Sequence, residues 1–169
     1  IKKNSASKAV AIRIFKNPMA IVGILLVIIL CFAAVFAPIL TQYSPTKVTV
    51  SDAFLTPSLK HFAGTDDLGR DIFTRLLYGS RYSILLGVAS TAGALIIGIF
   101  IGSISGYFGG QVDNIIMRIL DVIQSMPSML FAIIISAVLG AGFVQTIVAL
   151  SVASIPGMAR MMRANILSV

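Results

Sequence analysis

Three long stretches of the chain contain no charged residue, and this feature limits the possible folds more than any other. They are residues 19–40, 82–112 and 122–159. An α-helix needs about 20 apolar residues to cross the hydrocarbon layer of a bilayer. The first two stretches each predict one span, and the third, with the helical turns before it, is long enough for two. The chain is therefore predicted to be an integral membrane protein.

We expect an all-α, polytopic membrane helix bundle with four spans, at residues 19–40, 82–106, 114–139 and 143–167. The predicted organisation is a basic tail (residues 1–18), the first span, an extracytoplasmic segment (residues 41–81) and a core of three spans (residues 82–169). The formal net charge of +7 does not predict nucleic-acid binding, because the basic residues form no patch on a folded polar face.

The basic residues also indicate the orientation of the chain in the membrane. The tail before the first span carries five of them without any acid: Lys2, Lys3, Lys8, Arg13 and Lys16. Such a flank is typical of the cytoplasmic side. A cytoplasmic N-terminus and four spans place residues 41–81 outside and the C-terminus inside. Eight basic residues then lie inside and five outside, where four aspartates share their segment.

The stretch "GTDDLGRDIFTR" (residues 64–75) concentrates charges that are scarce elsewhere. From Thr65 onward it predicts an amphipathic helix on the outer interface, capped by Thr65 or Asp66. Two pairs with four-residue spacing, Asp66–Arg70 and Asp71–Arg75, would lie along that helix. Exposed pairs of this kind contribute only about 0.3–0.5 kcal/mol each, so stability is not their main role. Nearby His61 is expected to be a solvated surface residue.

Small residues recur every four positions in the second predicted span: Ser90, Ala94, Gly98, Gly102 and Gly106. On a helix they form one stripe without bulk, and such stripes allow neighbouring backbones to approach closely in lipid. A helix that is merely rich in glycine is the alternative. We expect the stripe to be a packing face.

Prolines predict kinks in the third and fourth spans. Pro127 and Pro156 each remove a backbone donor. Around the first, Ser125 and Met126 add a mildly polar, flexible stretch that could border a transport path, although a kink that only improves packing is equally compatible. Arg118 and Asp121, three residues apart on the third span, are expected to pair. The pair is structural near the inner boundary and functional if it lies deep in the membrane.

No catalytic constellation is present in the sequence. It has no Glu, one His and one Cys, so no metal-ligand spacing exists. The spans contain no His or Lys to activate a serine, and no phosphate-binding loop is found. We expect a non-catalytic protein that binds neither metal nor cofactor, with any energy source on another subunit.

Three segments resemble one known family in their order and spacing. They read "HFAGTDDLGRDIFTRLLYGSRYSILLG", "GYFGGQVDNIIMRILDVIQSMPSMLFAI" and "IPGMARMMRANILSV". The chain resembles the C-type permease subunits of ABC importers for dipeptides, oligopeptides and nickel peptides. The "GTDxLGRD" element is specific for this branch. The glycine-rich turn and the "IPGMAR" helix end are similar to the wider family of binding-protein-dependent permeases.

The resemblance implies a bacterial or archaeal cytoplasmic membrane and several partners. They are a homologous second permease subunit, two ATP-binding subunits that carry ATP and Mg, and an extracytoplasmic substrate-binding protein. It also implies that the protein continues past Val169 with a coupling loop and two more spans, six in all. Arg160 and Arg163 match the approach to that loop.

The resemblance further implies a role for the outer motif, which is formed by Gly64, Thr65, Asp66, Gly69, Arg70 and Asp71, with Arg75 beside it. The motif is expected to be a gate or a dock for the binding protein, and a plain anchor for the second span is the rival interpretation. A self-contained secondary transporter or channel, formed by homo-oligomerisation, is the alternative function. A membrane-bound enzyme is disfavoured. The sequence does not indicate which solute is carried.

Overall fold

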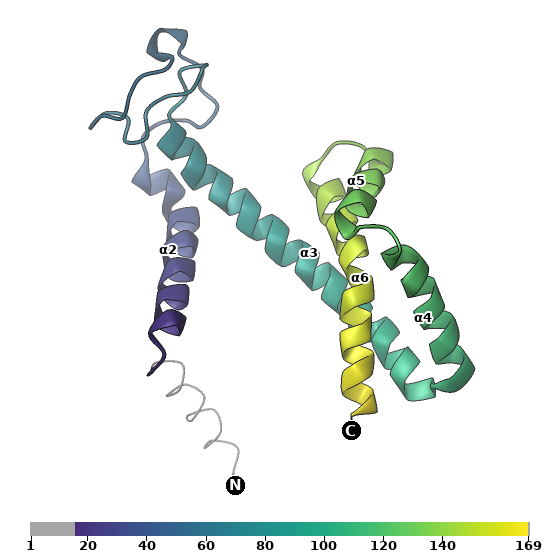
Figure 1. Ribbon diagram of the computed structural model, residues 1–169. Coiled ribbons are helices and arrows are strands. Elements are labelled where there is room, and N and C mark those ends of the chain that lie inside the picture. The colour runs from purple at the N-terminus through teal and green to yellow at the C-terminus, as the bar shows by residue number, and fades with distance from the viewer. Residues whose placement is uncertain (1–15, 169) are drawn as a thin grey trace. The chain divides into compact units, whose positions relative to one another are not determined.

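The computed structural model describes residues 16–168, so the predicted basic tail lies almost entirely outside the described residues. The described part contains five α-helices and one short 3₁₀ helix, and it forms no β-strand. They are α2 (Pro18–Leu40), η1 (Val50–Asp52), α3 (Ile72–Phe108), α4 (Gly110–Gln124), α5 (Ser128–Leu139) and α6 (Phe143–Leu167) (Figure 1). The predicted all-α membrane fold is confirmed. The described residues form two compact units, which are divided between residues 84 and 85.

Helix α2 is a membrane span with bounds close to those predicted. The Asn17 side chain accepts a hydrogen bond from the backbone N–H of Met19 at 3.1 Å, and Pro18 occupies the first turn, so the start of the helix is well defined. Most of its large apolar side chains are exposed within the chain. In a bilayer these side chains can face lipid.

Helix α3 differs from the prediction at its start. It runs without interruption for 37 residues from Ile72 to Phe108, which is about 55 Å at 1.5 Å per residue. The separate outer amphipathic helix predicted from Thr65 does not exist, since residues 64–71 form turns closed by an isolated bridge between Thr65 and Asp71. The prediction was wrong because it extended the helical apolar spacing into a segment that is folded by side-chain hydrogen bonds.

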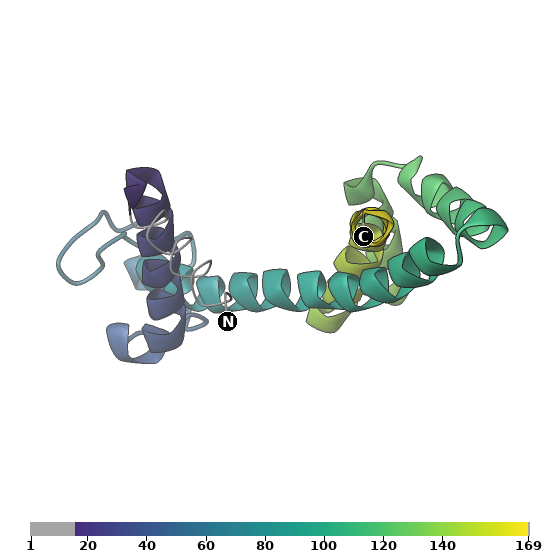
Figure 2. The same ribbon diagram turned by 90° about the horizontal axis from the view of Figure 1, so that it is seen from below.

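The third predicted span is broken rather than kinked. Helices α4 and α5 are bent by 84° at a short break, and they count as one span only if the bent pair is taken together (Figures 1 and 2). Pro127 lies at the break, where its carbonyl oxygen accepts a hydrogen bond from the backbone N–H of Phe131 at the start of α5. The backbone N–H of Ser125 closes the last turn of α4. The sequence predicted a kink at Pro127 within one helix, whereas the structure has a break between two helices at this position.

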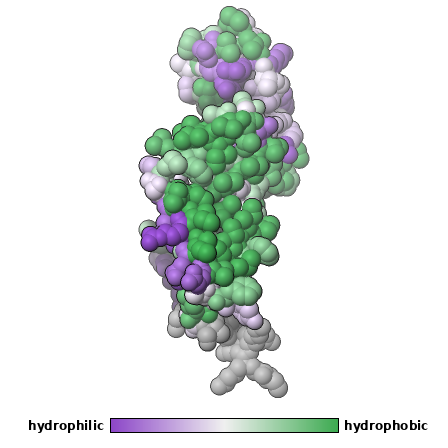
Figure 3. Space-filling model, turned by 90° about the vertical axis from the view of Figure 1, so that its right-hand side faces the viewer, coloured by the Kyte–Doolittle hydropathy of each residue, from purple (hydrophilic) through white to green (hydrophobic). Residues whose placement is uncertain are grey.

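Helix α6 forms the centre of the second unit. It continues through Pro156, which is buried, and its bounds agree with the predicted fourth span. Helices α4 and α5 both pack against it. Its buried positions are small, including Ala149, Ala153 and Ala159. On the face shown in the space-filling view, hydrophobic side chains cover most of the visible helix surface, and hydrophilic ones form small separate groups (Figure 3).

Candidate functional site

Asp66 organises the outer motif as the acceptor in a tight turn. Its Oδ1 accepts hydrogen bonds from the backbone N–H groups of Leu68 at 3.0 Å and Arg70 at 2.9 Å. Its Oδ2 accepts from Nε of Arg70 at 2.7 Å and from Nη1 of Arg75 at 2.5 Å. Partial burial would raise the pKa of Asp66, but these four hydrogen bonds outweigh it and hold the pKa well below its usual range.

One of the two predicted ion pairs is confirmed and the other is wrong. Asp66 pairs with Arg70 as expected, although within a turn rather than along a helix. Arg75 binds Asp66 instead of Asp71. The four-residue spacing is meaningful only on a helix, and because the chain turns back between residues 66 and 70, Arg75 reaches the earlier aspartate.

Thr65 and Gly69 hold the motif against the segment that contains η1. The Thr65 hydroxyl accepts from the backbone N–H of Leu55 at 2.8 Å and donates to the carbonyl oxygen of Asp52. Gly69 has a φ of +69°, and a Cβ there would overlap the backbone carbonyl of Thr49. Gly64 is similar, with a φ of +73°. These positions require glycine for both conformation and space.

Asp71 forms a second, buried network. Its Oδ1 lies 2.9 Å from Nδ1 of His61, and its Oδ2 accepts from the backbone N–H and the hydroxyl of Thr74, each at 2.7 Å. The bond to the Thr74 N–H makes Asp71 the cap of α3, whereas the sequence predicted an earlier helix capped by Thr65 or Asp66. Burial would raise the pKa of Asp71, but the hydrogen bonds from Thr74 and the contact with His61 lower it overall.

His61 is therefore not the solvated surface residue that we predicted. It is 4% exposed, and its ring lies against that of Tyr43 with 4.9 Å between centroids. Its Nε2 atom is buried and has no hydrogen-bond partner. A neutral ring that donates from Nδ1 to Asp71 leaves only a lone pair unsatisfied, which is less costly than a buried N–H donor without an acceptor.

The buried network extends to the end of α2. The hydroxyl oxygens of Thr74 and Thr41 lie 2.5 Å apart, and the backbone N–H of Tyr43 donates to Thr41 at 3.2 Å. Thr74 is fully buried. A continuous chain of hydrogen bonds therefore runs from His61 through Asp71 and Thr74 to Thr41. It fixes the first turn of α3 to the residues that directly follow α2.

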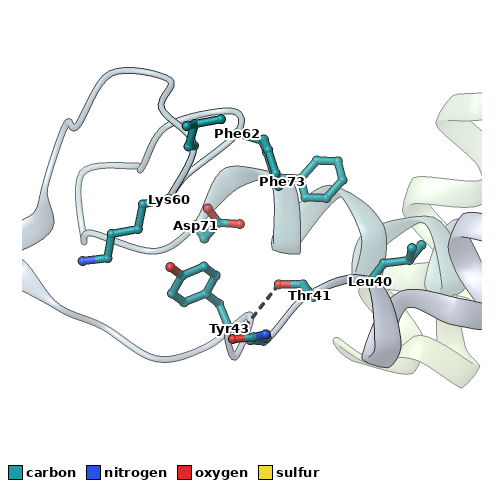
Figure 4. Close-up of a pocket in the computed structure, with 9 residues that line it drawn as sticks. Leu40, Thr41, Tyr43, Lys60, Phe62, Asp71 and Phe73 are labelled. Carbon is teal, nitrogen blue, oxygen red and sulfur yellow. Dashed lines mark hydrogen bonds between the residues drawn. The ribbon is translucent and has the colours of Figure 1, made fainter.

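A pocket of about 270 Å³ opens beside this network. In Figure 4 the carboxylate of Asp71 faces its interior, with the rings of Tyr43 and Phe73 on either side and Lys60 near its mouth. The volume lies at the lower limit for small-molecule sites. Two of the side chains that line the pocket, Leu59 and Phe62, are apolar and exposed.

In the second unit, the small-residue stripe faces α6. A Cβ at Gly98 would collide with Met158 and one at Gly102 with the carbonyl oxygen of Ala159, and one at Gly106 would be in tight contact with Ile166. Ala94 is fully buried, and the carbonyl oxygen of Ser90 accepts a hydrogen bond from the Ser151 hydroxyl at 3.0 Å. The backbones of the two helices thus meet with almost no side chain between them.

The two arginines expected near a coupling loop both pair with aspartates of α4. Nε and Nη2 of Arg163 lie 2.5 Å from Oδ1 and Oδ2 of Asp113, which also accepts from the hydroxyl of Ser105. Nη1 of Arg160 lies 3.6 Å from Oδ1 of Asp121. The predicted pairing of Asp121 with Arg118 is wrong, because α6 supplies a closer guanidinium.

The residues at the helix break are all exposed on the second unit. Ser125, Met126 and Pro127 lie between α4 and α5, and their side chains pack against no core. Pro156 is different because it is buried within α6. The structure therefore separates the two prolines that the sequence treated alike.

Sequence reasoning missed several members of these sites. Thr74 follows Asp71 by three residues, and this spacing is a sequence signal for an N-cap. No local signal connects Thr41 with Thr74 or Asp113 with Arg163, since the partners are 33 and 50 residues apart.

Together the spans, the broken helix and the polar outer segment define a polytopic α-helical membrane protein. Residues 98–169 match the family described as "Binding-protein-dependent transport system inner membrane component". Residues 5–57 match the "N-terminal TM domain of oligopeptide transport permease C". Both family models describe membrane components of transport systems, and together they match most of this chain.

Curated relatives agree with this assignment. The chain is 40% identical to the dipeptide transport system permease protein of Alkalihalophilus pseudofirmus, over 90% of this chain and 50% of the relative. It is also 40% identical to the oligopeptide transport system permease protein of Bacillus subtilis, over 99% and 55%. The probable D,D-dipeptide transport system permease protein of Escherichia coli is 35% identical, over 90% and 51%. The chain spans about half the length of these relatives.

Proposed function

We propose that this protein is a permease subunit of an ABC importer and forms half of a translocation path for short peptides or related small solutes. The observation that carries the proposal is the identity of 35–40% to permease proteins named for dipeptides and oligopeptides, over nine-tenths or more of this chain. The helices described above provide the apolar length that such a subunit needs.

ATP hydrolysis would take place on two separate subunits, and this chain would be non-catalytic. The described residues include no group of three His, Cys, Asp or Glu side chains that could hold a metal ion. The further partners would be a homologous permease subunit and an extracytoplasmic binding protein. In this arrangement the N-terminus and the end of α6 lie on the cytoplasmic side, and the outer motif lies on the opposite side.

The outer motif would act mainly as an anchor rather than a gate. Its charges are used internally, because Asp66 accepts four hydrogen bonds and Asp71 three. A gate or a docking surface needs groups free to exchange partners. Replacement of Arg70 and Asp71 by Ala tests this role: we expect loss of assembly, whereas intact assembly with lost transport would support a gate.

The exposed break at Ser125–Pro127 would border the translocation path. Irregular backbone at membrane depth is tolerated only where protein or a water-filled cavity surrounds it. Arg160 and Arg163 would link the cytoplasmic end of α6 to α4, so that movement imposed by the ATP-binding subunits reaches the broken helix.

The proposal is tested by reconstituting the full-length protein with its partner subunits in proteoliposomes. We expect uptake of a labelled dipeptide only when ATP, both ATP-binding subunits and the binding protein are present. Uptake that continues after the ATP-binding subunits are removed would instead support a secondary transporter or channel.

A further inference from the structure

The polar side of α4 carries a charged cluster that the proposed function does not yet explain. Asn114, Arg118 and Asp121 follow one another at helical spacing, and with Met117 they line a hollow of about 430 Å³. Helix α4 belongs to a bent pair that is apolar enough to form a span. Ionisable side chains in such segments are energetically costly and usually serve a function.

A comparison of the two Asp–Arg pairs on α4 and α6 indicates which one is available to a ligand. Asp113 and Arg163 satisfy each other through two parallel contacts at 2.5 Å, and Ser105 adds a third bond. Asp121 and Arg160 share a single contact at 3.6 Å, which is longer than a hydrogen bond. The charged groups of Asp113 and Arg163 are therefore hydrogen-bonded to each other, whereas those of Asp121 and Arg160 are not.

Unused donors surround the incomplete pair. The Nη2 atom of Arg160 is buried and has no hydrogen-bond partner. Arg118 is exposed, and within residues 16–168 it forms no ion pair or hydrogen bond. Asp121 keeps a side chain that is 55% exposed. Two guanidinium groups and one carboxylate give the cluster a net positive charge and leave N–H groups for another acceptor.

These donors fit a carboxylate. Guanidinium groups bind carboxylates through two parallel N–H···O bonds, and they do so more strongly than neutral donors. Asp121 would repel a purely anionic ligand, but it would attract an ammonium group on the same molecule. The mixed charge therefore favours a zwitterion over an anionic lipid headgroup, for which a purely basic cluster is the better partner.

We infer that the α4 charge cluster, formed by Asn114, Arg118, Asp121 and Arg160, binds the carboxylate of a zwitterionic solute as it passes, with Arg118 as the principal contact. This inference rests on the proposed function. It adds a specificity site within the permease itself.

The test compares uptake of a dipeptide with that of its C-terminal amide by the reconstituted full-length transporter. Arg118→Gln is expected to lower the ratio of acid to amide uptake by about tenfold, as for loss of a charge-assisted hydrogen bond. Arg118→Lys should restore most of the ratio. Arg81→Gln, an exposed arginine of the other unit, is the matched control and should leave the ratio unchanged.

Each further outcome has a distinct meaning. If Arg118→Gln does not assemble, Asn114→Asp replaces it, because a carboxylate one turn before Arg118 neutralises that side chain. An unchanged ratio in the variant that assembles overturns the inference but leaves the proposed function intact. Absence of dipeptide uptake by the unmodified transporter contradicts the proposed function itself.

The lipid alternative is tested in the same vesicles. Phosphatidylcholine vesicles with and without phosphatidylglycerol distinguish a solute carboxylate from a lipid phosphate. If the unmodified transporter needs phosphatidylglycerol, and Arg118→Gln removes that need without changing the ratio, the cluster binds lipid and the inference is wrong.

Discussion

Arg75 and Asp66 are nine residues apart in the sequence, yet Nη1 of the arginine lies 2.5 Å from Oδ2 of the aspartate. The same oxygen accepts a hydrogen bond from Arg70. The first turn of α3 is thus held by a charge in the turn before it, and this relationship can be tested directly.

Asp66→Ala should loosen the outer segment much more than Asp67→Ala. The first change removes the acceptor of four hydrogen bonds, whereas Asp67 is 67% exposed and its nearest charged atom, Nη2 of Arg70, is 3.9 Å away. Proteolysis of residues 41–71 in the purified protein measures the effect. Equal cleavage of the two variants would show that the turn does not depend on Asp66.

The outer segment should also respond to acid in a defined direction. The folded pKa of Asp66 lies below its ordinary value of 3.8, so the ionised form is stabilised by folding. Its stabilising effect is complete above that value and is lost as the pH falls below it through the folded pKa.

We expect proteolysis by an acid-active protease to be constant from pH 7 to about pH 5 and to increase below about pH 4. Asp66→Asn, which cannot ionise, should lose this part of the pH dependence. An identical pH profile in the variant would assign the acid response to another group, such as Asp71.

Gly69→Ala should disrupt the outer segment, and Gly140→Ala should not do so to the same extent. Both glycines have positive φ values, +69° and +89°. A Cβ at Gly69 would overlap the carbonyl of Thr49, whereas nothing lies within 4 Å of one at Gly140. Both substitutions place alanine at a positive φ, but only Gly69→Ala also introduces a steric overlap. Comparing the two variants therefore distinguishes the effect of the overlap from the effect of the backbone conformation. Similar losses of folded protein on size-exclusion chromatography would mean that conformation alone matters.

Gly102→Ala should destabilise the contact between α3 and α6 by about 1–3 kcal/mol, the usual cost of overpacking. The added methyl group would meet the carbonyl oxygen of Ala159. Gly87→Ala in the same helix meets no atom within 4 Å and should be neutral or slightly stabilising, because alanine has the higher helix propensity. Thermal unfolding in detergent measures both, and a stable Gly102→Ala variant would contradict the close contact.

Thr74→Val keeps the side-chain volume but removes the hydroxyl that joins Asp71 to Thr41. Because these groups are buried, the loss should cost about 1–3 kcal/mol. Thr91→Val, at an exposed position of α3, is the control. A lower melting temperature for Thr74→Val alone supports the anchor, and equal melting temperatures would argue against it.

Much of the membrane architecture could be predicted because long uncharged stretches have few alternatives in a bilayer. The bounds of α2 and α6 follow from such stretches, and the break at Pro127 follows from its missing N–H. The four-residue stripe indicated a contact face without naming its partner. These features depend on local chemistry that the sequence displays directly.

The outer segment could not be predicted in the same way. Apolar residues at helical spacing favoured a helix from Thr65, but the side chains of Asp66 and Thr65 offered the backbone competing hydrogen bonds. His61 became buried because Asp71 and Tyr43 surround it, and their approach depends on the folding of the whole segment. Contacts between distant residues decided these outcomes.

The contact of Gly98, Gly102 and Gly106 with α6 also affects how this protein can evolve. No amino acid is smaller than glycine, so every substitution at these positions adds atoms close to the backbone or side chains of α6. Substitutions at these three positions can therefore damage the contact but cannot improve its fit. Functional change would have to arise at positions with room to vary, such as the exposed residues at the helix break and the polar side of α4.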